Sequence, residues 1–557
     1  MLTRAVAFYT DKIKDKVDWR LLTFLLLFLN VKLAVKIPVI ILFSLWQFNF
    51  KFGFRFKGSR LPLFYPLIIV IALVNWVIYK DYINGNYNIM LFVGIGFWFL
   101  CILAIHQVKL AVDNNPPAIV HQTISVFFIV NTLISVLTLV VIILKTHTIN
   151  PYTYQGEYQK YFINTGDYIK GITFDTSITN ATLNAFGVIY FLIRKNAVML
   201  LVCMATLLLT GSNFINLALL PILLLLFAFK TNRYQKSLVV VCLVFLIVFM
   251  AKISPQNDKY AAQTLVYVFQ KNKPVNTVEP PINPTANLRI TDRPDNTLTP
   301  EEHKQKIATL YLDSIGKILD SVRVGKRPKY AKNVYLANGG RVAVTEPDIN
   351  DDYHQSKKET PVEQLQLLDF IKAHKAVLPI SGNDNYTPGL PGKTIGFLQT
   401  TALFRGHLSK TLTGVGMGNF SSKIAFRAAG LGFAGGYPSR NIYINHDFLV
   451  NHLDLYLNFF SRRSGLHSLT NSPFSVYDQL LAEYGVIGLV LFVMFYVGFF
   501  AKHYQKLTYG LPILFLMLAV LFTDYWFEQL SVIVFFELLL LLNIKENQTV
   551  KPPGYEF

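Results

Sequence analysis

Long runs of apolar residues recur along roughly the first 250 residues and the last 80 residues of this chain. An apolar run of about 20 residues is long enough to cross a hydrocarbon core about 30 Å thick as an α-helix. The pattern therefore predicts an all-α polytopic membrane protein with about 12 transmembrane helices. The predicted spans cover residues 21–31, 33–48, 62–79, 88–105, 119–144, 179–193, 196–210, 213–229, 236–252, 476–500, 509–524 and 528–543.

The first two predicted spans are separated by a short polar stretch. A single helix over residues 21–48 would place Lys32 and Lys36 near the centre of the bilayer. A charge there costs about 2.5–3.5 kcal/mol on insertion scales. Two short helices joined at residues 30–32 would let both lysines reach an interface, so we predict a helical pair.

Two polar segments interrupt the apolar pattern, at residues 145–178 and 253–475. The second is a large insertion between the ninth and tenth predicted spans, and it begins with a linker rich in Pro, Asn and Thr at 271–300. Capping signals predict two helices inside it, starting at Thr299 and Thr360. We expect three parts: an N-terminal transmembrane bundle at 1–252, the insertion at 253–475, and C-terminal transmembrane helices with a tail at 476–557.

The chain carries 52 Lys and Arg against 33 Asp and Glu, which gives a formal net charge of +19. In a membrane protein such an excess indicates topology signals and anionic lipid or phosphate-bearing partners, and we expect no nucleic-acid partner. The basic residues gather in alternate loops, which predicts cytoplasmic N- and C-termini and an insertion outside the cytoplasm. Cys101, Cys203 and Cys242 all lie in apolar runs, so no disulfide framework is expected.

The densest group of polar residues lies at 400–488, before and inside the tenth predicted span. Gly414, Gly416 and Gly418 alternate along it, which lets successive backbone N–H groups approach an anion, and the same spacing also fits a simple turn. Fork-shaped guanidinium groups match phosphate oxygens. The arginines of this stretch are Arg405, Arg427, Arg440, Arg462 and Arg463.

This composition suits group transfer from a lipid diphosphate at a membrane surface. Arginines would neutralise the leaving diphosphate, and a histidine would accept the proton of an attacking hydroxyl near neutral pH. With the charge neutralised in this way, neither a metal nor another cofactor is expected. A metal site at His446, Asp447 and His452 is the alternative, although no Cys or HExxH pattern supports it.

Three local patterns resemble the O-antigen ligase and O-antigen polymerase superfamily, in the order that this family has them. Lys170-Gly171-Ile-Thr-Phe174-Asp175 resembles the loop ahead of the sixth helix of the family, and Thr210-Gly211-Ser212-Asn213 resembles its Thr-x-Ser-Arg corner. The third pattern resembles the C-terminal signature and runs from Arg405 through Gly414-x-Gly416-x-Gly418-x-Phe420 to Leu481-Ala-Glu483-Tyr-Gly485-x-x-Gly488.

The resemblance implies a fold similar to type C glycosyltransferases. It implies transfer of a glycan from an undecaprenyl diphosphate carrier at the periplasmic face of the bacterial inner membrane. It also implies catalytic roles for His467 and Glu483, and binding of diphosphate or glycan by Lys170, the five arginines and the three glycines named above. Two positions depart from the family pattern: Asn213 replaces the usual Arg, and Phe474-Ser475 replaces the usual His-Asn, so that His467 is the nearest histidine upstream.

We therefore expect a glycosyltransferase of the O-antigen ligase or polymerase type, embedded among membrane lipids. Its acceptor would be lipid A-core, another glycan repeat unit or a protein, and direct displacement would invert the anomeric carbon. The alternative is a transporter or flippase of a lipid-linked saccharide, a class whose polar groups usually lie midway through broken helices. Here the ionisable residues gather at one face and in one loop, which favours surface chemistry.

Overall fold

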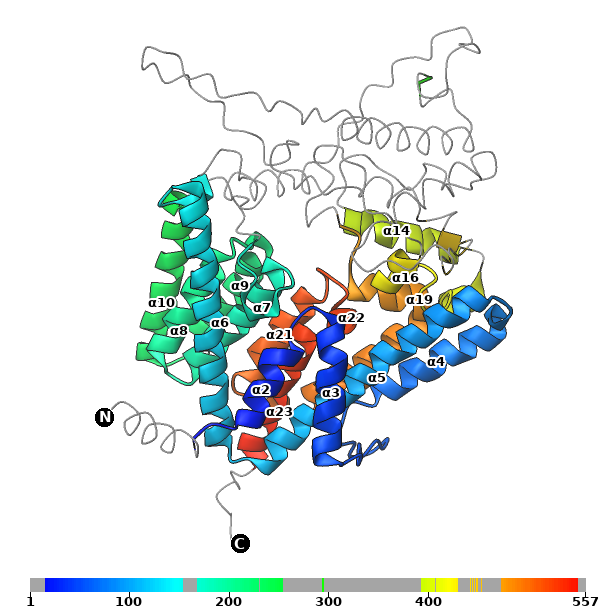
Figure 1. Cartoon of the computed structure of the whole chain (residues 1–557), viewed down its shortest axis with the longest axis horizontal. Coiled ribbons are helices and arrows are strands. Elements are labelled where there is room, and N and C mark those ends of the chain that lie inside the picture. Colours follow the sequence, from blue (N-terminus) through cyan, green and yellow to red (C-terminus); the bar gives the residue numbers. More distant parts are fainter. Residues whose placement is uncertain are drawn as a thin grey trace. The chain divides into compact units, whose positions relative to one another are not determined.

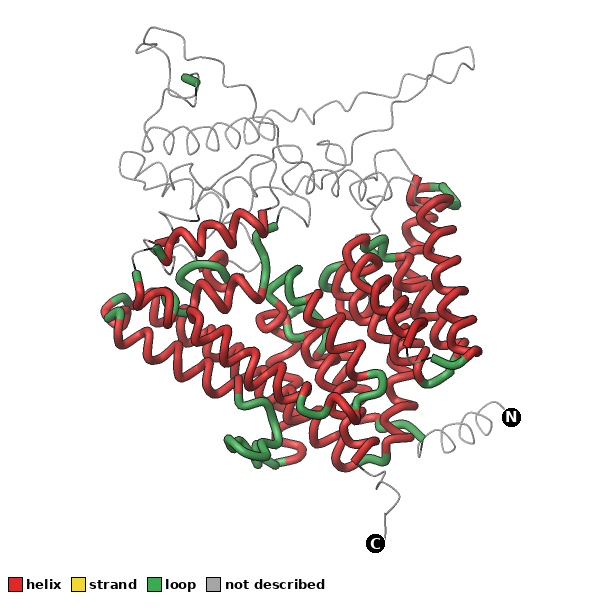
Figure 2. Tube along the Cα trace, turned by 180° about the vertical axis from the view of Figure 1, so that it is seen from behind, coloured by secondary structure: helices red, strands yellow, loops and turns green. Residues whose placement is uncertain are grey.

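The computed structural model describes residues 16–153, 168–229, 231–253, 293–294, 392–405, 407–428, 441, 443, 445, 447–448, 452 and 472–548. Helices are the only regular structure in these residues, and Figure 2 shows no strand among them. The all-α class predicted from the sequence is confirmed for this part of the chain. The helices predicted to start at Thr299 and Thr360 lie outside it.

The helical elements are labelled in Figure 1, where η marks 3-10 or π-helical turns. The N-terminal elements are α2 (Trp19–Phe28), α3 (Leu33–Gln47), α4 (Phe64–Ile78), η1 (Asp81–Ile83), α5 (Gly85–Asn114), α6 (Pro117–Thr146), η2 (Pro151–Thr153), η4 (Gly171–Thr173), α7 (Ser177–Ile193), α8 (Ala197–Leu209), α9 (Asn213–Phe229), α10 (Arg233–Val248) and η5 (Phe249–Ile253). The later elements are α14 (Gly392–Phe404), α15 (Leu408–Thr413), α16 (Lys423–Ala428), α19 (Val476–Leu491), η9 (Phe492–Val497), α20 (Gly498–Ala501), η10 (Tyr504–Lys506), α21 (Gly510–Val520), α22 (Trp526–Gln529) and α23 (Ser531–Gln548).

Each of the twelve predicted apolar segments coincides with a helix, so the predicted helix positions are confirmed. In the described part of the chain, three helical stretches are long and apolar enough to cross a membrane: Gly85–Asn114, Pro117–Thr146 and Val476–Lys506. Seven further apolar helices have 10–17 residues. The predicted count of twelve complete spans is therefore not supported by helix length.

A contact with a distant segment accompanies the early end of one short helix. Helix α2 has 10 residues, so it is only about 15 Å long at about 1.5 Å per residue. Its N-cap is Asp18, and three residues after its end the amide of Val31 donates to the carbonyl of Thr173 at 2.8 Å. This contact takes the chain out of helical geometry, and it confirms the predicted break between the first two helices.

Lys36 differs from its predicted place at an interface. It lies inside α3 with 2% of its surface exposed. Its Nζ donates to the carbonyl of Phe28 at 2.7 Å and to the hydroxyl of Ser531 at 3.2 Å. The last carbonyls of a helix lack intrahelical donors, so the end of α2 supplies an acceptor that the sequence pattern did not reveal.

The described residues form two compact units. Unit 1 contains those within 1–73, 92–261 and 487–557, and unit 2 contains those within 74–91 and 262–486. Each unit joins segments that are distant in sequence. The predicted division at residues 252 and 475 follows chain order, and it stays a prediction because most of 253–475 lies outside the described residues.

Helix α7 forms the centre of unit 1, with nearly all of its residues buried. It packs against α8, α9, α21 and α23, while α6, α8 and α10 lie side by side (Figure 1). A second packed region joins four aromatic rings, Phe64, Trp98, Tyr496 and Phe527, whose centroids lie 5.3–5.8 Å apart. The three cysteines are free and buried, as their apolar surroundings predicted.

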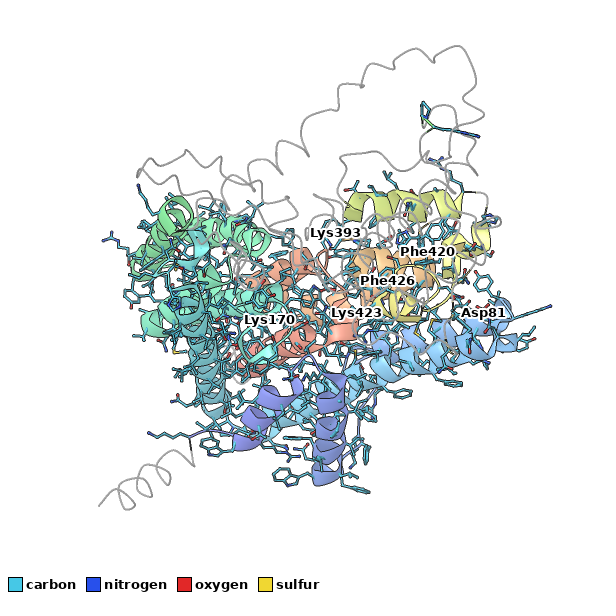
Figure 3. All side chains as sticks on the ribbon, turned by 45° about the horizontal axis from the view of Figure 1, so that its top comes forward. Asp81, Lys170, Lys393, Phe420, Lys423 and Phe426 are labelled. Carbon is cyan, nitrogen blue, oxygen red and sulfur yellow. The ribbon has the colours of Figure 1, made fainter. Side chains whose placement is uncertain are left out.

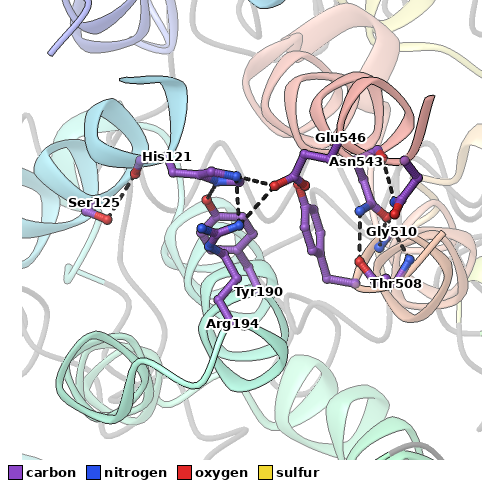
Figure 4. A network of polar contacts seen from close by, with 10 residues as sticks. His121, Ser125, Tyr190, Arg194, Thr508, Gly510, Asn543 and Glu546 are labelled. Atoms are coloured by element: carbon purple, nitrogen blue, oxygen red, sulfur yellow. Dashed lines mark hydrogen bonds and ion pairs between the residues drawn. The ribbon is translucent and has the colours of Figure 1, made fainter. Parts of the chain in front are cut away.

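A network of polar contacts ties helix ends together within unit 1 (Figure 4). His121 of α6 contacts both the hydroxyl of Tyr190 and the carboxylate of Glu546. Arg194 donates to the same carboxylate at 3.0 Å, and the hydroxyl of Tyr509 donates to its second oxygen at 2.8 Å. Because the Glu546 carboxylate contacts residues from three other helix ends, this network fixes the ends of α6, α7, α21 and α23 against one another.

Candidate functional site

Unit 2 contains all of the described candidate residues except Lys170. Its elements are the end of α4, η1, the start of α5, α14, α15, α16 and the first turns of α19. The glycine-rich segment 414–418 connects α15 to the residues that lead into α16. Residues of α19 and of the end of α4 contact this segment.

The glycine-rich segment packs directly on an interruption of α19. The helix is broken at Gly485, which has a φ of +67°. A Cβ added at Gly414, where φ is +77°, would lie 2.3 Å from the backbone carbon of Glu483. A Cβ added at Gly485 would lie 2.3 Å from the carbonyl oxygen of Leu412. Both glycines are therefore required by backbone conformation and by close approach.

Backbone hydrogen bonds join the two segments. The amide of Val415 donates to the carbonyl of Ala482 at 2.9 Å, and the amide of Gly416 donates to the carbonyl of Glu483 at 3.1 Å. These are carbonyls that the break in α19 leaves without helical donors. The glycine spacing fitted either an anion site or a simple turn, and the amides of Val415 and Gly416 complete the broken helix.

Two side chains from the end of α4 hold the other side of this segment. The Nδ2 of Asn75 donates to the carbonyl of Thr413 at 2.6 Å, and the hydroxyl of Tyr79 donates to the carbonyl of Gly414 at 2.8 Å. The chain near residue 75 is thereby fixed against a segment more than 300 positions away. The turn that follows α4, with η1, is thereby held close to the glycine-rich segment.

That turn brings an acidic side chain to the site (Figure 3). The half-buried Asp81 of η1 accepts a hydrogen bond from the Nδ2 of Asn419 at 3.4 Å. The Oδ1 of Asn419 accepts from the hydroxyl of Tyr443 at 3.0 Å. Burial raises the pKa of Asp81 to about 6, with a smaller rise from the negative charge of Asp447 and an opposing effect from the Asn419 hydrogen bond. This carboxyl therefore exchanges a proton near neutral pH, as a general base must.

Three basic side chains of unit 2 differ in their surroundings. Lys410 forms an ion pair with Asp447 at 2.8 Å. Arg405 is exposed at the end of α14, where its guanidinium is accessible to a ligand. Arg427 is half-buried in α16, and its Nε is buried without a hydrogen-bond partner among the described residues. Two of the predicted arginines are thus placed in unit 2.

The predicted catalytic Glu483 is fully buried. Its Oε1 accepts from the amide of Phe420 at 3.4 Å, so it orients the chain that leaves the glycine-rich segment. Asp478, one turn earlier in α19, accepts from the hydroxyl of Thr400 at 2.6 Å and from that of Ser421 at 2.9 Å. Both carboxylates join α19 to neighbouring segments, and the catalytic role of Glu483 stays a prediction.

His452 lies in the interior of unit 2. Its Nδ1 is 2.7 Å from Oε1 of Gln399, and its ring stacks on Phe420 with centroids 4.5 Å apart. Burial lowers the pKa of His452 to about 3, so the ring is neutral at physiological pH. In the described part of the chain no three His, Cys, Asp or Glu side chains group as metal ligands. His446, the third member of the alternative metal site, lies outside it.

Lys170 belongs to unit 1 and is half-buried. The neighbouring Gly171 has a φ of +59°, and a Cβ there would lie 2.3 Å from Oδ1 of Asn131 and 2.6 Å from Oδ1 of Asn180. The amide of Ile172 donates to Asn131 at 3.0 Å. The asparagines of α6 and α7 therefore fix the loop that carries Lys170. His467, Arg440, Arg462 and Arg463 lie outside the described residues.

Sequence analysis missed two residues of this region. Asp81 is the only acidic residue in a short polar turn between two apolar runs. That position is the feature of the sequence that could have identified it as a site residue. Lys393 gave no signal. It is buried in α14, and its Nζ donates to Ser472 at 2.9 and 3.0 Å and to the carbonyl of Phe474 at 2.7 Å. It holds the chain that leads into α19 (Figure 3).

Replacing Lys393 by methionine is expected to lower the free energy of unfolding by about 2–3 kcal/mol, because it leaves buried acceptors without their donor. Lys423→Met is the matched control, since Lys423 is a half-buried lysine of α16 with no hydrogen bond or ion pair in the described part of the chain. It should change stability by less than about 0.5 kcal/mol. Thermal and denaturant unfolding of the purified protein in detergent would measure both. Equal effects of the two variants would contradict the role of Lys393.

No known protein family, curated protein or solved structure matches this chain.

Proposed function

We propose that this protein is a membrane glycosyltransferase of the O-antigen ligase or polymerase type. It would transfer a saccharide from an undecaprenyl-diphosphate carrier to an acceptor hydroxyl at the periplasmic face of the bacterial inner membrane. The acceptor would belong to lipid A-core, another glycan or a protein.

One observation carries the proposal. Two parts of the C-terminal pattern that resembles this superfamily, the glycine-rich segment with Phe420 and residues 482–485, pack together in unit 2, although 63 positions separate Phe420 from Glu483. The amides of Val415 and Gly416 bond to carbonyls beside Gly485, and the amide of Phe420 bonds to Glu483. Asn419 of the same pattern donates to the half-buried Asp81, whose pKa is about 6. This packing supports a structural meaning of the pattern.

The reaction would be a direct displacement. A base accepts the proton of the acceptor hydroxyl, whose oxygen forms a bond to the anomeric carbon. The bond from that carbon to the diphosphate oxygen breaks, and the electron pair leaves with the diphosphate. Arg405, whose side chain is exposed, would neutralise that charge. The resemblance gives the base role to His467, and Asp81 is a second group suited to it.

The membrane arrangement is part of the proposal. Three helical stretches are long enough to cross a membrane, and the seven shorter apolar helices together with α10 and α23 would complete a bundle of twelve segments similar to type C glycosyltransferases. Both termini would be cytoplasmic, and residues 253–475 would be periplasmic. The excess of Lys and Arg in alternate loops supports this orientation.

The proposal is tested by the surface glycans of a strain that lacks the protein. Loss of long chains with retained single repeats indicates a polymerase, and complete loss from the acceptor indicates a ligase. Retained transfer with donor accumulating at the cytoplasmic face contradicts both activities. Complementation with His467→Ala, or with Arg405→Lys, which keeps the charge but loses the bidentate fork, would then show whether these residues are needed.

We expect transfer by the purified protein to persist in excess chelator. The arginines carry permanent charge and match phosphate geometry, so they can neutralise the diphosphate without a divalent cation. A transfer assay with EDTA, followed by restored Mg²⁺ or Mn²⁺, measures this. Activity that disappears with EDTA and returns with the metal would contradict the arginine-based mechanism.

A transporter of a lipid-linked saccharide is the second candidate, because unit 1 buries ionisable groups inside its helices. Glu537 of α23 is fully buried and accepts from the hydroxyl of Tyr65 at 2.5 Å, and Lys36 is buried in α3. Such groups often mark transport pathways. A vesicle assay distinguishes the candidates: Glu537→Gln should abolish lipid translocation by a transporter, and it should leave glycan transfer by a transferase largely intact.

A further inference from the structure

A cavity of about 230 Å³ lies in unit 1 between the start of α2, the end of α3 and the end of α5. Asp18, Arg20 and Asn115 form part of its polar wall. Phe24 and Phe43 form part of its apolar wall. A cavity with one polar and one apolar wall suits an amphipathic ligand.

The Arg20 guanidinium is held by two aromatic rings and an amide oxygen, and the charge of Asp18 acts on it from beyond ion-pair distance. The guanidinium lies over the ring of Trp46 at 5.2 Å and over that of Phe43 at 5.9 Å. With its amide oxygen turned inward, Gln47 accepts from both terminal nitrogens, at 2.5 and 2.9 Å, which leaves the remaining N–H groups of the guanidinium for a ligand. Among the described residues, no carboxylate lies within 4.0 Å of this guanidinium. A stacked, positively charged fork in a cavity is suited to a phosphate group.

The same cavity presents a fixed negative charge. The Oδ1 of Asp18 accepts from the amides of Arg20 and Leu21 at 3.0 and 3.1 Å. Its Oδ2 accepts from the Nδ2 of Asn115 at 2.7 Å. No basic side chain in the described part of the chain lies within 4.0 Å of this carboxylate. The cavity thus offers one positive and one negative group that do not close into an ion pair.

The surroundings of the cavity are those of a membrane interface. Trp19 and Trp46 are 49% and 71% exposed, and tryptophan is enriched where hydrocarbon meets headgroups. Along α3, Leu42 and Leu45 are 63% and 58% exposed. An apolar helix face therefore runs away from the cavity, as acyl chains would require.

We propose that this cavity binds the headgroup of a zwitterionic phospholipid that carries a primary amine, of the phosphatidylethanolamine class. The phosphate lies against Arg20, the ammonium lies against Asp18, and the acyl chains follow the exposed face of α3. A choline headgroup lacks N–H donors for Asp18, and a glycerol headgroup lacks the positive charge that Asp18 would meet. The amine lipid is therefore preferred over both.

Native mass spectrometry of the purified full-length protein in detergent tests this binding. The protein is titrated with phosphatidylethanolamine, phosphatidylcholine and phosphatidylglycerol of equal chain length, and with inorganic phosphate. We expect phosphatidylethanolamine to bind at least about tenfold more tightly than the other ligands. Equal binding of the three lipids, tighter binding of phosphatidylglycerol, or equal binding of free phosphate would each overturn the proposal.

Two variants locate the site. Arg20→Ala should weaken phosphatidylethanolamine binding by about tenfold or more, whereas Lys57→Ala, at an exposed lysine that does not line the cavity, should leave it unchanged. Asp18→Asn keeps a good N-cap residue for α2, and it removes the negative charge together with the acceptor for Asn115. Thermal unfolding establishes that the variant is folded, and the folded variant should reverse the preference toward phosphatidylglycerol. Unchanged lipid selectivity in a folded Asp18→Asn protein would sink the assignment of the ammonium.

Discussion

Gly485→Ala is expected to lower the free energy of unfolding by about 3–5 kcal/mol and to abolish glycan transfer. An alanine at a φ of +67° costs about 1–2 kcal/mol by itself. Its Cβ would also lie 2.3 Å from the carbonyl oxygen of Leu412 and 2.5 Å from the amide nitrogen of Gly414, so the backbone of one segment must move. That movement breaks the hydrogen bonds that Val415 and Gly416 donate to α19.

Gly58→Ala is the matched control. Gly58 has a φ of +70°, close to that of Gly485, but nothing lies within 4 Å of an added Cβ there. The control should therefore show the conformational cost alone, about 1–2 kcal/mol or less. Thermal unfolding in detergent and a transfer assay measure both variants. If Gly485→Ala were no worse than Gly58→Ala, the close packing of the glycine-rich segment on α19 would be wrong.

Helix positions were predictable because their signal is local. An apolar run fixes a helix through its own residues, and every predicted span coincides with one. Helix length was less predictable, because it depends on contacts with distant residues. Helix α2 ends where Val31 bonds to Thr173, a partner that no pattern near residue 31 announces.

The candidate site was predictable only in its motif. The glycines at 414–418 and the Glu483–Gly485 stretch were identified from the sequence, and they do pack together. Their use was not predictable, since alternating glycines are compatible both with binding an anion and with close backbone packing. The structure uses the amide of Gly416 for packing.

Single buried side chains were beyond the reach of pattern analysis. Asp81 and Asn419 are 338 positions apart, and Lys393 and Ser472 are 79 apart. Charged residues are usually exposed, so the sequence alone favours a surface place for Lys36 and Lys393. Only the tertiary structure supplies the carbonyls and hydroxyls that allow these lysines to be buried.

Asp81→Asn is expected to slow glycan transfer by about 10²–10⁴-fold, the usual loss when a general base is removed. The wild-type rate should fall as pH drops through about 6, where the Asp81 carboxylate takes up its proton. This fall in rate at low pH, the acid limb of the pH–rate profile, should be missing from the residual activity of the variant. His467→Ala provides the comparison, because its effect should be larger than that of Asp81→Asn if His467 is the base.

Stability separates a catalytic role of Asp81 from a structural one. Burial raises the pKa of Asp81 above its ordinary value of 3.8, so the folded state holds this proton more tightly than the unfolded chain does. The charged form therefore opposes folding above about pH 6, and the opposition is relieved as pH falls toward 4. Asp81→Asn should consequently be at least as stable as the wild type at pH 7 while being far less active. A variant that loses activity only because it unfolds would contradict the base role.

Two neighbouring substitutions should move the acid limb in opposite directions. Asp447→Asn removes a negative charge that raises the pKa of Asp81, so the limb should shift to lower pH. Asn419→Ala removes a hydrogen bond that lowers this pKa, so the limb should shift to higher pH. Transfer rates between pH 5 and 8 would measure both shifts. A limb that stays in place in both variants would show that the titrating group is not Asp81, and His467 would then be the leading base.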